Sequence, residues 1–289
     1  MTVEPGGKQN SYVMDAESAA EMGRLMRLDA EVTECMGGLF PQYPDLAGVR
    51  RTLDVACGPG AWVNEMAYQY QDMQVTGIDI SQIMIRYAQE MARVQRLENA
   101  HFQVMDATQP LAFPDGSFDL VNARFLFGFM SKAAWPRTVR EFVRVTRPGG
   151  IIRLTEIDSL CLSNSQALEK LNHLFARSFF VTGRSFSPYA QAQHIGLTLM
   201  LPAFLMEAGC QDIRQQPYAI DFSAGAKAHL SHYENFKVGF KLFQPFLVQA
   251  GVTTQEELDQ LYEQMLADML SEHFRGVLYF LCVWGTKPA

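Results

Sequence analysis

Short apolar runs alternate with longer segments in which apolar residues recur every three or four positions. The short runs predict buried strands, and the periodic segments predict helices with one apolar face. The expected strands of the first half are Arg51–Ala56, Gln74–Asp79, His101–Met105, Phe118–Asn122 and Ile151–Glu156. Strands that alternate with helices pair in parallel through right-handed crossovers. The sequence therefore predicts an α/β fold with a parallel sheet between residues 51 and 157.

The pattern becomes mainly helical after residue 157. Helices are expected at Gln166–Phe180, Tyr189–Ala208, Ala226–Gln249 and Gln255–His273. Two further strands are expected at Ile213–Phe222 and Val277–Gly285. The segment between these two strands is far longer than a hairpin needs. It is therefore expected to add structure outside the sheet.

A glycine-rich turn after the first expected strand is the strongest sign of chemistry in the chain. Gly58 and Gly60 let the backbone approach a ligand where a Cβ would clash. A dinucleotide-binding turn would have a third glycine where this chain has Val63. Asp54 at the strand end would repel a pyrophosphate but not an amino or sulfonium group. The turn therefore favours a cationic, phosphate-free adenosine ligand over NAD.

An acid also ends the second expected strand, where it can accept hydrogen bonds from ribose hydroxyls. The turn Asp54-x-x-Cys57-Gly58-Pro59-Gly60, followed by that acid, Asp79, resembles the first motifs of the class I S-adenosylmethionine (SAM) dependent methyltransferases. Further motifs follow in the order of that family: Asp106-Ala107-Thr108, Phe118–Ala123 and Arg147-Pro148-Gly149-Gly150. The resemblance implies a SAM-binding, Rossmann-like core that transfers a methyl group and releases S-adenosylhomocysteine (SAH).

The resemblance assigns roles to residues at matching positions. It implies that Asp79 binds the ribose, that Asp106 approaches the adenine amino group, and that Ile80 and Met84 flank the adenine. Tyr12, ahead of Glu21-x-x-Arg24-Leu25, is similar to a tyrosine that folds over the cofactor in many small-molecule methyltransferases. The implied cofactor-binding residues are Tyr12, Asp54, Ala56, Gly58, Pro59, Gly60, Asp79, Ile80, Met84, Asp106, Ala107, Asn122 and Ala123.

The resemblance also divides the chain. Residues 1–50 are expected to form an N-terminal helical cap segment, 51–157 the SAM-binding core, and 158–209 a helical lid insertion. Residues 210–289 are expected to supply the last two strands of a seven-stranded sheet, with a helical insertion at 223–273. Ligands of open α/β sheets bind at the carboxyl ends of the strands. We therefore expect the additions to form a helical cap over that edge.

Composition and charge narrow the partners. A net charge of −7 argues against a general nucleic-acid surface. Asn122-Ala123-Arg124-Phe125 lacks the two prolines that adenine-N6 methyltransferases carry there, which argues against DNA as a substrate. The five cysteines form no Cys-x-x-Cys pair, and no cluster has metal-ligand spacing, so neither a disulfide framework nor a metal is expected. A polar start and the lack of a long apolar run predict a cytoplasmic protein without a membrane span.

Aromatic residues crowd the expected cap and favour a small, largely apolar substrate. They are Phe125, Phe127, Phe129, Phe179, Phe180, Phe186, Tyr189, Tyr233, Phe236, Phe240, Phe243 and Phe246. Methyl transfer depends mainly on proximity and orientation. An oxygen or carbon acceptor often also needs a base. The candidate catalytic residues are His194, His232 and Tyr189, all in cap segments.

Functions from different classes stay open on the sequence alone. The first is methyl transfer to an O, N or C nucleophile of a small, largely apolar molecule, in specialised metabolism. The second is a SAM-binding protein that does not methylate, either a pericyclase-like enzyme or a regulatory subunit, because no general base is obvious. A nucleotide-dependent oxidoreductase is disfavoured by Val63 and Asp54. A homodimer through the cap helices is compatible with the sequence and not required by it.

Overall fold

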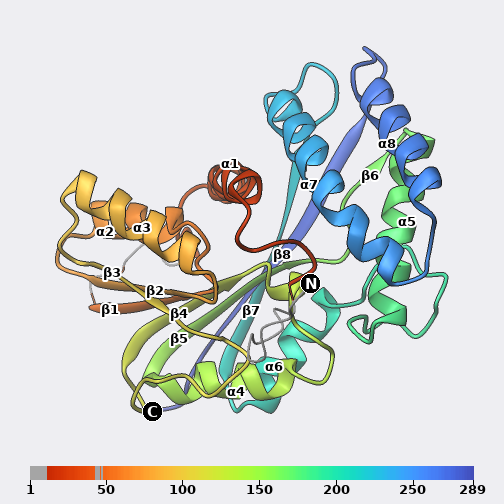
Figure 1. Ribbon diagram of the computed structural model, residues 1–289. Coiled ribbons are helices and arrows are strands. Elements are labelled where there is room, and N and C mark those ends of the chain that lie inside the picture. Colours follow the sequence, from red (N-terminus) through yellow and green to blue (C-terminus); the bar gives the residue numbers. More distant parts are fainter. Residues whose placement is uncertain (1–11, 43–45, 47) are drawn as a thin grey trace, which may run out of the picture.

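A mixed sheet forms the centre of the computed structural model, which describes residues 12–42, 46 and 48–289 (Figure 1). The strands are β1 (Arg51–Val55), β2 (Gln74–Asp79), β3 (Ala100–Val104), β4 (Phe118–Arg124), β5 (Thr146–Ile157), β6 (Leu162–Ser163), β7 (Gln211–Asp221) and β8 (Gly276–Thr286). Their order is β3-β2-β1-β4-β5-β8-β6, with β7 also paired to β8. The sequence-based prediction of an α/β, Rossmann-like sheet is confirmed, and the two-residue β6 is added to the seven expected strands.

The pairing directions explain where a ligand can bind. Strands β1 to β5 pair in parallel, so their carboxyl ends share one edge of the sheet. Strand β8 runs antiparallel between β5 and β7. Asp54 of β1 lies opposite Gly77 of β2 and Asn122 of β4. The acids and the amide singled out in the sequence therefore converge on this edge.

Helices cover both faces of the sheet. Helices α2 (Ala61–Gln69) and α3 (Gln82–Gln95) lie over one face, and α4 (Trp135–Val145) and α6 (Leu201–Glu207) over the other (Figure 1). Helix α4 buries Trp135, Val139 and Phe142, which recur at helical spacing. Trp135 stacks on Phe204 of α6, with ring centroids 5.8 Å apart. Burial of such rings fixes the helices on the sheet.

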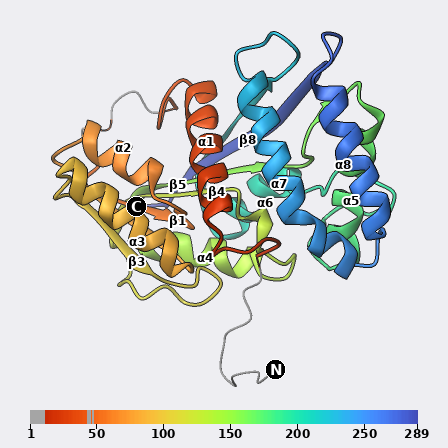
Figure 2. The same ribbon diagram turned by 45° about the horizontal axis from the view of Figure 1, so that its top comes forward.

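Four further helices lie beyond the sheet edge. They are α1 (Ala19–Met36), α5 (Gln166–Val181), α7 (His229–Gln249) and α8 (Gln255–Met269). Figure 2 shows α1 between α2 and α3 on one side and α7 on the other. Helix α7 also packs on α5 and α8. A cluster of phenylalanines joins α5 and α7, and Phe175 and Phe179 lie within 6.5 Å of the Phe243 ring centroid.

The prediction of a helix at Tyr189–Ala208 is wrong over most of its length. The chain is irregular up to a 3₁₀ turn at Thr198–Met200, and only α6 is an α-helix. Gly196 has a φ of +70°, and a Cβ there would lie 2.9 Å from the backbone nitrogen of Ser187. Asp158 accepts hydrogen bonds from the backbone nitrogens of Leu197 and Thr198, which replaces helical bonding there.

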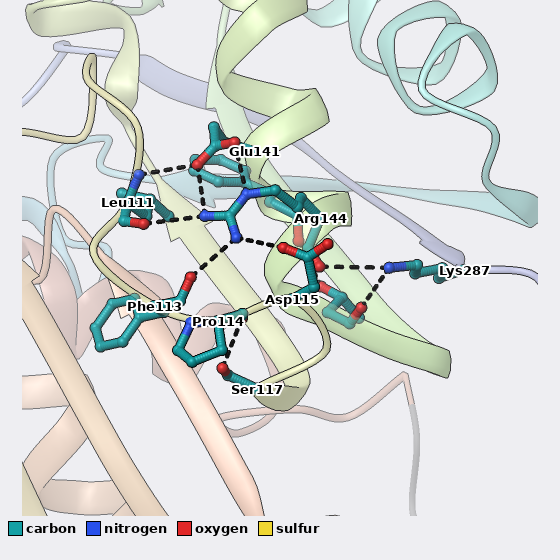
Figure 3. Close-up of polar contacts among 10 residues, drawn as sticks. Leu111, Phe113, Pro114, Asp115, Ser117, Glu141, Arg144 and Lys287 are labelled. Atoms are coloured by element: carbon teal, nitrogen blue, oxygen red, sulfur yellow. Dashed lines mark hydrogen bonds and ion pairs between the residues drawn. The ribbon is translucent and has the colours of Figure 1, made fainter.

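The loop between β3 and β4 is anchored at the C-terminal end of α4 (Figure 3). Arg144 of α4 donates to the carbonyl oxygens of Leu111 and Phe113, at 2.9 Å each, and to Asp115 at 2.7 Å. Glu141 accepts from Arg144 and from the backbone nitrogen of Leu111. These bonds hold a loop whose first residues include Asp106 and Ala107.

Candidate active site

A cavity lies where the carboxyl ends of β1 to β5 meet α1, α5 and α7. Its wall near the glycine turn includes Asp54, Ala56, Cys57, Gly58, Pro59, Asp79, Ile80, Met84, Asp106 and Ala107. Its wall near the cap includes Arg24, Phe127, Phe129, Leu160, Phe175, Asn235, Phe236, Gly239, Phe240, Phe243 and Leu278. We call these the cofactor half and the acceptor half. One continuous cavity thus joins the motifs of the core to the aromatic residues of the cap.

The two glycines of the turn face opposite ways. Gly58 has a φ of +53°, and a Cβ there would meet only Leu25, at 3.8 Å. Gly60 has a φ of +78°, but its Cβ would lie 2.6 Å from both Ala88 and Phe102. Gly58 therefore presents bare backbone to the cavity, whereas Gly60 allows close packing of the turn on α3 and β3. Gly60 is not among the residues that line the cavity, so its predicted contact with the cofactor lacks geometric support.

Asp79 ties the turn to the second strand. Its Oδ2 accepts a hydrogen bond from the backbone nitrogen of Gly58, and its Oδ1 accepts one from Ser81, both at 2.9 Å. Burial raises the pKa of Asp79 above its usual value, against the effect of these hydrogen bonds. Asp106 accepts from the nitrogen and the hydroxyl of Thr108, both through Oδ1. Both carboxylates are thus fixed in orientation while they line the cavity.

Asp54 is the most deeply buried of these acids. Only 3% of its surface is exposed, and its Oδ1 accepts a 2.6 Å hydrogen bond from Asn122. Asn122 in turn accepts from Arg153 at 2.7 Å. Burial raises the pKa of Asp54 to about 7. Asn122 and Ala123 are fully buried and lie behind the wall, so the structure places them as supports for Asp54 and β4.

The cofactor half fits a cationic, phosphate-free nucleoside. Asp54, Asp79 and Asp106 supply three carboxyl groups, and Gly58 leaves room for close approach of a ligand. Arg24 and Arg124 also line the cavity, but each forms an ion pair, with Glu21 and Asp29 respectively. No basic residue of the described cavity wall is therefore left to bind a pyrophosphate.

The segment that leads into α1, which begins at Tyr12 in the described chain, forms another part of the cavity wall. The ring of Tyr12 lies over Gly128, where a Cβ would come within 2.6 Å of it. The backbone nitrogen of Val13 donates to the carbonyl oxygen of Gly128 at 2.9 Å. The Tyr12 hydroxyl donates to Glu21 at 2.6 Å. Glu21 also accepts from Arg24, which links this segment to α1.

Glu156 shapes the loop that follows β4. Its carboxylate accepts hydrogen bonds from the backbone nitrogens of Leu126 and Phe127, at 2.7 and 3.3 Å. Burial raises the pKa of Glu156 well above its usual value. Phe125, just before, has a φ of +58°, in the left-handed region. The sharp turn directs this loop along the cavity, which Phe125, Phe127, Gly128 and Phe129 line.

The three predicted catalytic residues do not line the cavity. His194 is exposed, and Tyr189 has 71% of its surface exposed. His232 is fully buried one turn before Phe236 on α7, where its Nδ1 lies 2.7 Å from Glu31 and its ring stacks on Phe222. Because His232 packs on these residues, and Tyr189 and His194 lie in an exposed irregular segment, none of the three meets the cavity.

Two polar residues of the acceptor half were missed as site residues. Arg24 entered the sequence analysis only as part of a motif, and Asn235 did not enter it at all. Asn235 stands one position before Phe236, four before Gly239 and eight before Phe243 on α7. Residues four apart share a helix face. A helical reading of the expected aromatic positions would therefore have placed Asn235 beside them.

Comparisons with known proteins agree with this geometry. Residues 52–150 match the model of a family described as a methyltransferase domain. The chain is 28% identical to demethylmenaquinone methyltransferase of Geobacillus kaustophilus over 182 residues, which cover 61% of this chain and 76% of that protein. It is 37% identical to ajmaline N-methyltransferase of Rauvolfia serpentina over 114 residues, which cover 39% and 38%.

A solved structure extends the likeness of the fold. Phosphoethanolamine N-methyltransferase 2 of Haemonchus contortus, in complex with phosphomonomethylethanolamine and SAH, superposes with a TM-score of 0.51 and 17% identity. The superposition covers 89% of this chain and 52% of that one. Fold, site and family match together define a class I methyltransferase that uses SAM. The similarity to the methyltransferase family lies in residues 52–150, the part of the chain that the family model matches.

Two features are absent from the described residues. No helix among them is long and apolar enough to cross a membrane. No group of three or more His, Cys, Asp or Glu residues among them is arranged to hold a metal ion. The prediction that the enzyme uses no metal stays a prediction.

Proposed function

We propose that this enzyme methylates an O, N or C nucleophile of a small, largely apolar molecule, in specialised metabolism. The observation that carries the proposal is the change in character along one cavity. Its cofactor half contains three carboxyl groups, and its acceptor half contains six phenylalanines from the loop after β4, α5 and α7: Phe127, Phe129, Phe175, Phe236, Phe240 and Phe243. An apolar wall of this kind suits an apolar acceptor.

Residues of the cofactor half would hold SAM. Asp79 would accept hydrogen bonds from the ribose hydroxyls, and Asp106 would accept one from the adenine amino group. Ile80 and Met84 would flank the adenine. The backbone at Gly58 leaves space for the ligand. When bound, SAM supplies an electrophilic methyl group. The protein contributes by excluding water and aligning the acceptor, which is the main requirement of a displacement reaction.

The named relatives support a small-molecule acceptor. One is named for demethylmenaquinone and another for ajmaline. We further propose that the enzyme works in the cytoplasm and acts without nucleic acid. The five cysteines are all free thiols, which suits a reducing compartment, and the net charge of −7 disfavours nucleic acid. A homodimer through the cap helices stays a prediction.

A second candidate function is SAM binding without methyl transfer, as in a pericyclase-like enzyme or a regulatory subunit. The observation that favours it is the make-up of the cavity wall, whose described residues include no histidine. Such a wall offers no group with an ordinary pKa near neutrality to deprotonate an oxygen or carbon acceptor.

Calorimetric titration of the purified protein with SAH, SAM and NAD tests the cofactor first. We expect binding of SAH and SAM but not of NAD, and absence of SAH binding would refute both candidate functions. Incubation with SAM and a panel of small aromatic alcohols, amines and enols then tests the reaction by mass spectrometry. Methylated product together with SAH supports the first candidate, whereas SAH binding without transfer to any acceptor supports the second.

A further inference from the structure

The acceptor half contains one hydrogen-bond donor without a partner. Asn235 has only 5% of its surface exposed and lines the cavity. Its Oδ1 accepts a 2.9 Å hydrogen bond from Nη1 of Arg24, which fixes the orientation of the amide. The amide nitrogen, Nδ2, has no hydrogen-bond partner among the described residues. Nδ2 is not among the fully buried polar atoms, so it is open to the cavity and poised to donate to a ligand there. A ligand that covered it without accepting a hydrogen bond would leave a buried donor unpaired, which is costly.

The surroundings of Asn235 hold the amide in place. Glu21, with no exposed surface, accepts two hydrogen bonds from Arg24, at 2.6 and 2.7 Å. Arg24 passes over Gly239, where a Cβ would lie 3.2 Å from its Cδ. A larger residue at this position of α7 would push the guanidinium aside. The chain from Glu21 through Arg24 to Asn235 therefore orients one amide within an apolar wall.

The charges of the acceptor half also limit the ligand. Arg24 is neutralised by Glu21, and Arg124, at the boundary of the two halves, is paired with Asp29. The other acceptor-half residues of the described wall are apolar, apart from Asn235. Burying an unpaired charge beside them would be costly. A phosphate, a carboxylate or an ammonium would therefore find no counter-charge in this half.

We propose that Asn235 is a specificity-determining residue that donates through Nδ2 to an oxygen of a neutral aromatic acceptor. The inference rests on the proposed function, because it assumes that the acceptor occupies the phenylalanine-lined half. It narrows the substrate class to uncharged ring compounds that carry a carbonyl, ether or hydroxyl oxygen. A hydrocarbon of the same shape would leave the amide of Asn235 without a hydrogen bond. A site that rejects an analogue in this way discriminates more strongly than one that selects by shape alone.

The test uses 1-tetralone and tetralin, which share a ring skeleton and differ in one carbonyl oxygen. Each is titrated calorimetrically into SAH-loaded protein. We expect 1-tetralone to bind about tenfold more tightly, the size of one buried hydrogen bond whose loss leaves a donor unpaired. Asn235→Asp keeps the acceptor for Arg24 and removes the donor, so it should abolish the preference while SAH affinity is unchanged. Asn164→Asp adds the same charge at an exposed site and should keep the preference.

The outcomes separate this inference from the proposed function. Failure of SAH to bind would overturn the proposed function. With SAH bound, equal affinity for the two probes, no binding of either probe, or an unchanged preference in Asn235→Asp would overturn the role of Asn235. Tighter binding of 1-naphthylmethylammonium or 1-naphthoate than of 1-tetralone would overturn the neutral character of the acceptor.

Discussion

The buried carboxyl group of Asp54 makes SAH binding and protein stability depend on pH in opposite directions. Burial raises the pKa of Asp54 to about 7, and the ionised form is the one that attracts a positively charged group, such as the amino group of SAH. The ionised fraction falls from about nine-tenths at pH 8 to about one-tenth at pH 6. If only the ionised form binds well, the SAH association constant should fall about tenfold between these values. Calorimetric titration at pH 6, 7 and 8 measures this directly.

Stability should change in the other direction. Asp54 has a higher pKa in the folded protein than the ordinary value of 3.8, so between pH 4 and pH 7 the folded state binds more protons than the unfolded state. The free energy of unfolding therefore falls as pH rises through this window. The shift from 3.8 to about 7 is about 3 units, and at about 1.4 kcal/mol per unit the cost above pH 7 reaches about 4 kcal/mol.

Asp54→Asn separates the two effects. The amide keeps an oxygen for Asn122 and carries no charge, so at pH 8 the variant should melt several degrees above the wild type. At pH 4 the two melting temperatures should be similar, because Asp54 is then protonated in the folded protein. SAH binding to the variant should be weaker at pH 8 and should lose the dependence on Asp54 ionisation. SAH affinity that is flat with pH in the wild type, or a variant that is less stable at pH 8, would refute this reasoning.

Other substitutions probe the turn, the second acid and the cap. Gly60→Ala should destabilise the protein by about 1–3 kcal/mol in denaturant unfolding, because the Cβ would overlap the packed Ala88. Gly58→Ala has a similar φ, but its Cβ would meet only Leu25 at an ordinary distance of 3.8 Å, so it should cost less stability and more SAH affinity. The reverse order of the two variants would contradict the assigned directions. Asp79→Ala should weaken SAH binding more than tenfold in calorimetric titration, and unchanged affinity would rule out the ribose contact. Phe243→Ala should cost about 3–5 kcal/mol of stability in thermal unfolding, because the ring is buried among other phenylalanines; a cost near zero would mean that the ring is not part of a packed core.

The sheet and the cofactor half were accessible to sequence analysis because their signals are local. An apolar strand, a glycine turn and an acid at the next strand end lie within about 30 residues, as in other βαβ units. Gly58 and Asp79 belong to this pattern and line the cavity. Gly60 belongs to it as well, but only the structure shows that its missing Cβ makes room for Ala88 and Phe102. Spacing alone does not distinguish contact with a ligand from contact with a neighbouring helix.

The acceptor half was less accessible because it depends on contacts between distant segments. Arg24 and Asn235 are 211 positions apart and meet only because α1 packs on α7. His232 was a reasonable candidate base by residue type, yet it lies about one turn before Asn235 on α7, where it packs on Glu31 and Phe222 and does not line the cavity. The helix expected at Tyr189–Ala208 failed for a related reason, since the side chain of Asp158 captures backbone nitrogens that a helix would use.

Because α7 lies between β7 and β8 in the chain, its residues can change in evolution independently of the cofactor-binding residues in the first half of the sheet. The matched methyltransferase domain ends at residue 150, whereas Asn235, Phe236, Phe240 and Phe243 lie in an insertion that contributes no strand to the sheet. If these residues bind the acceptor, as we propose, substitutions on that helix can alter which acceptor is used without touching the glycine turn or the acids. On that proposal, selection can diversify acceptors while cofactor binding is inherited unchanged, and relatives that share residues 52–150 are free to differ in what they methylate.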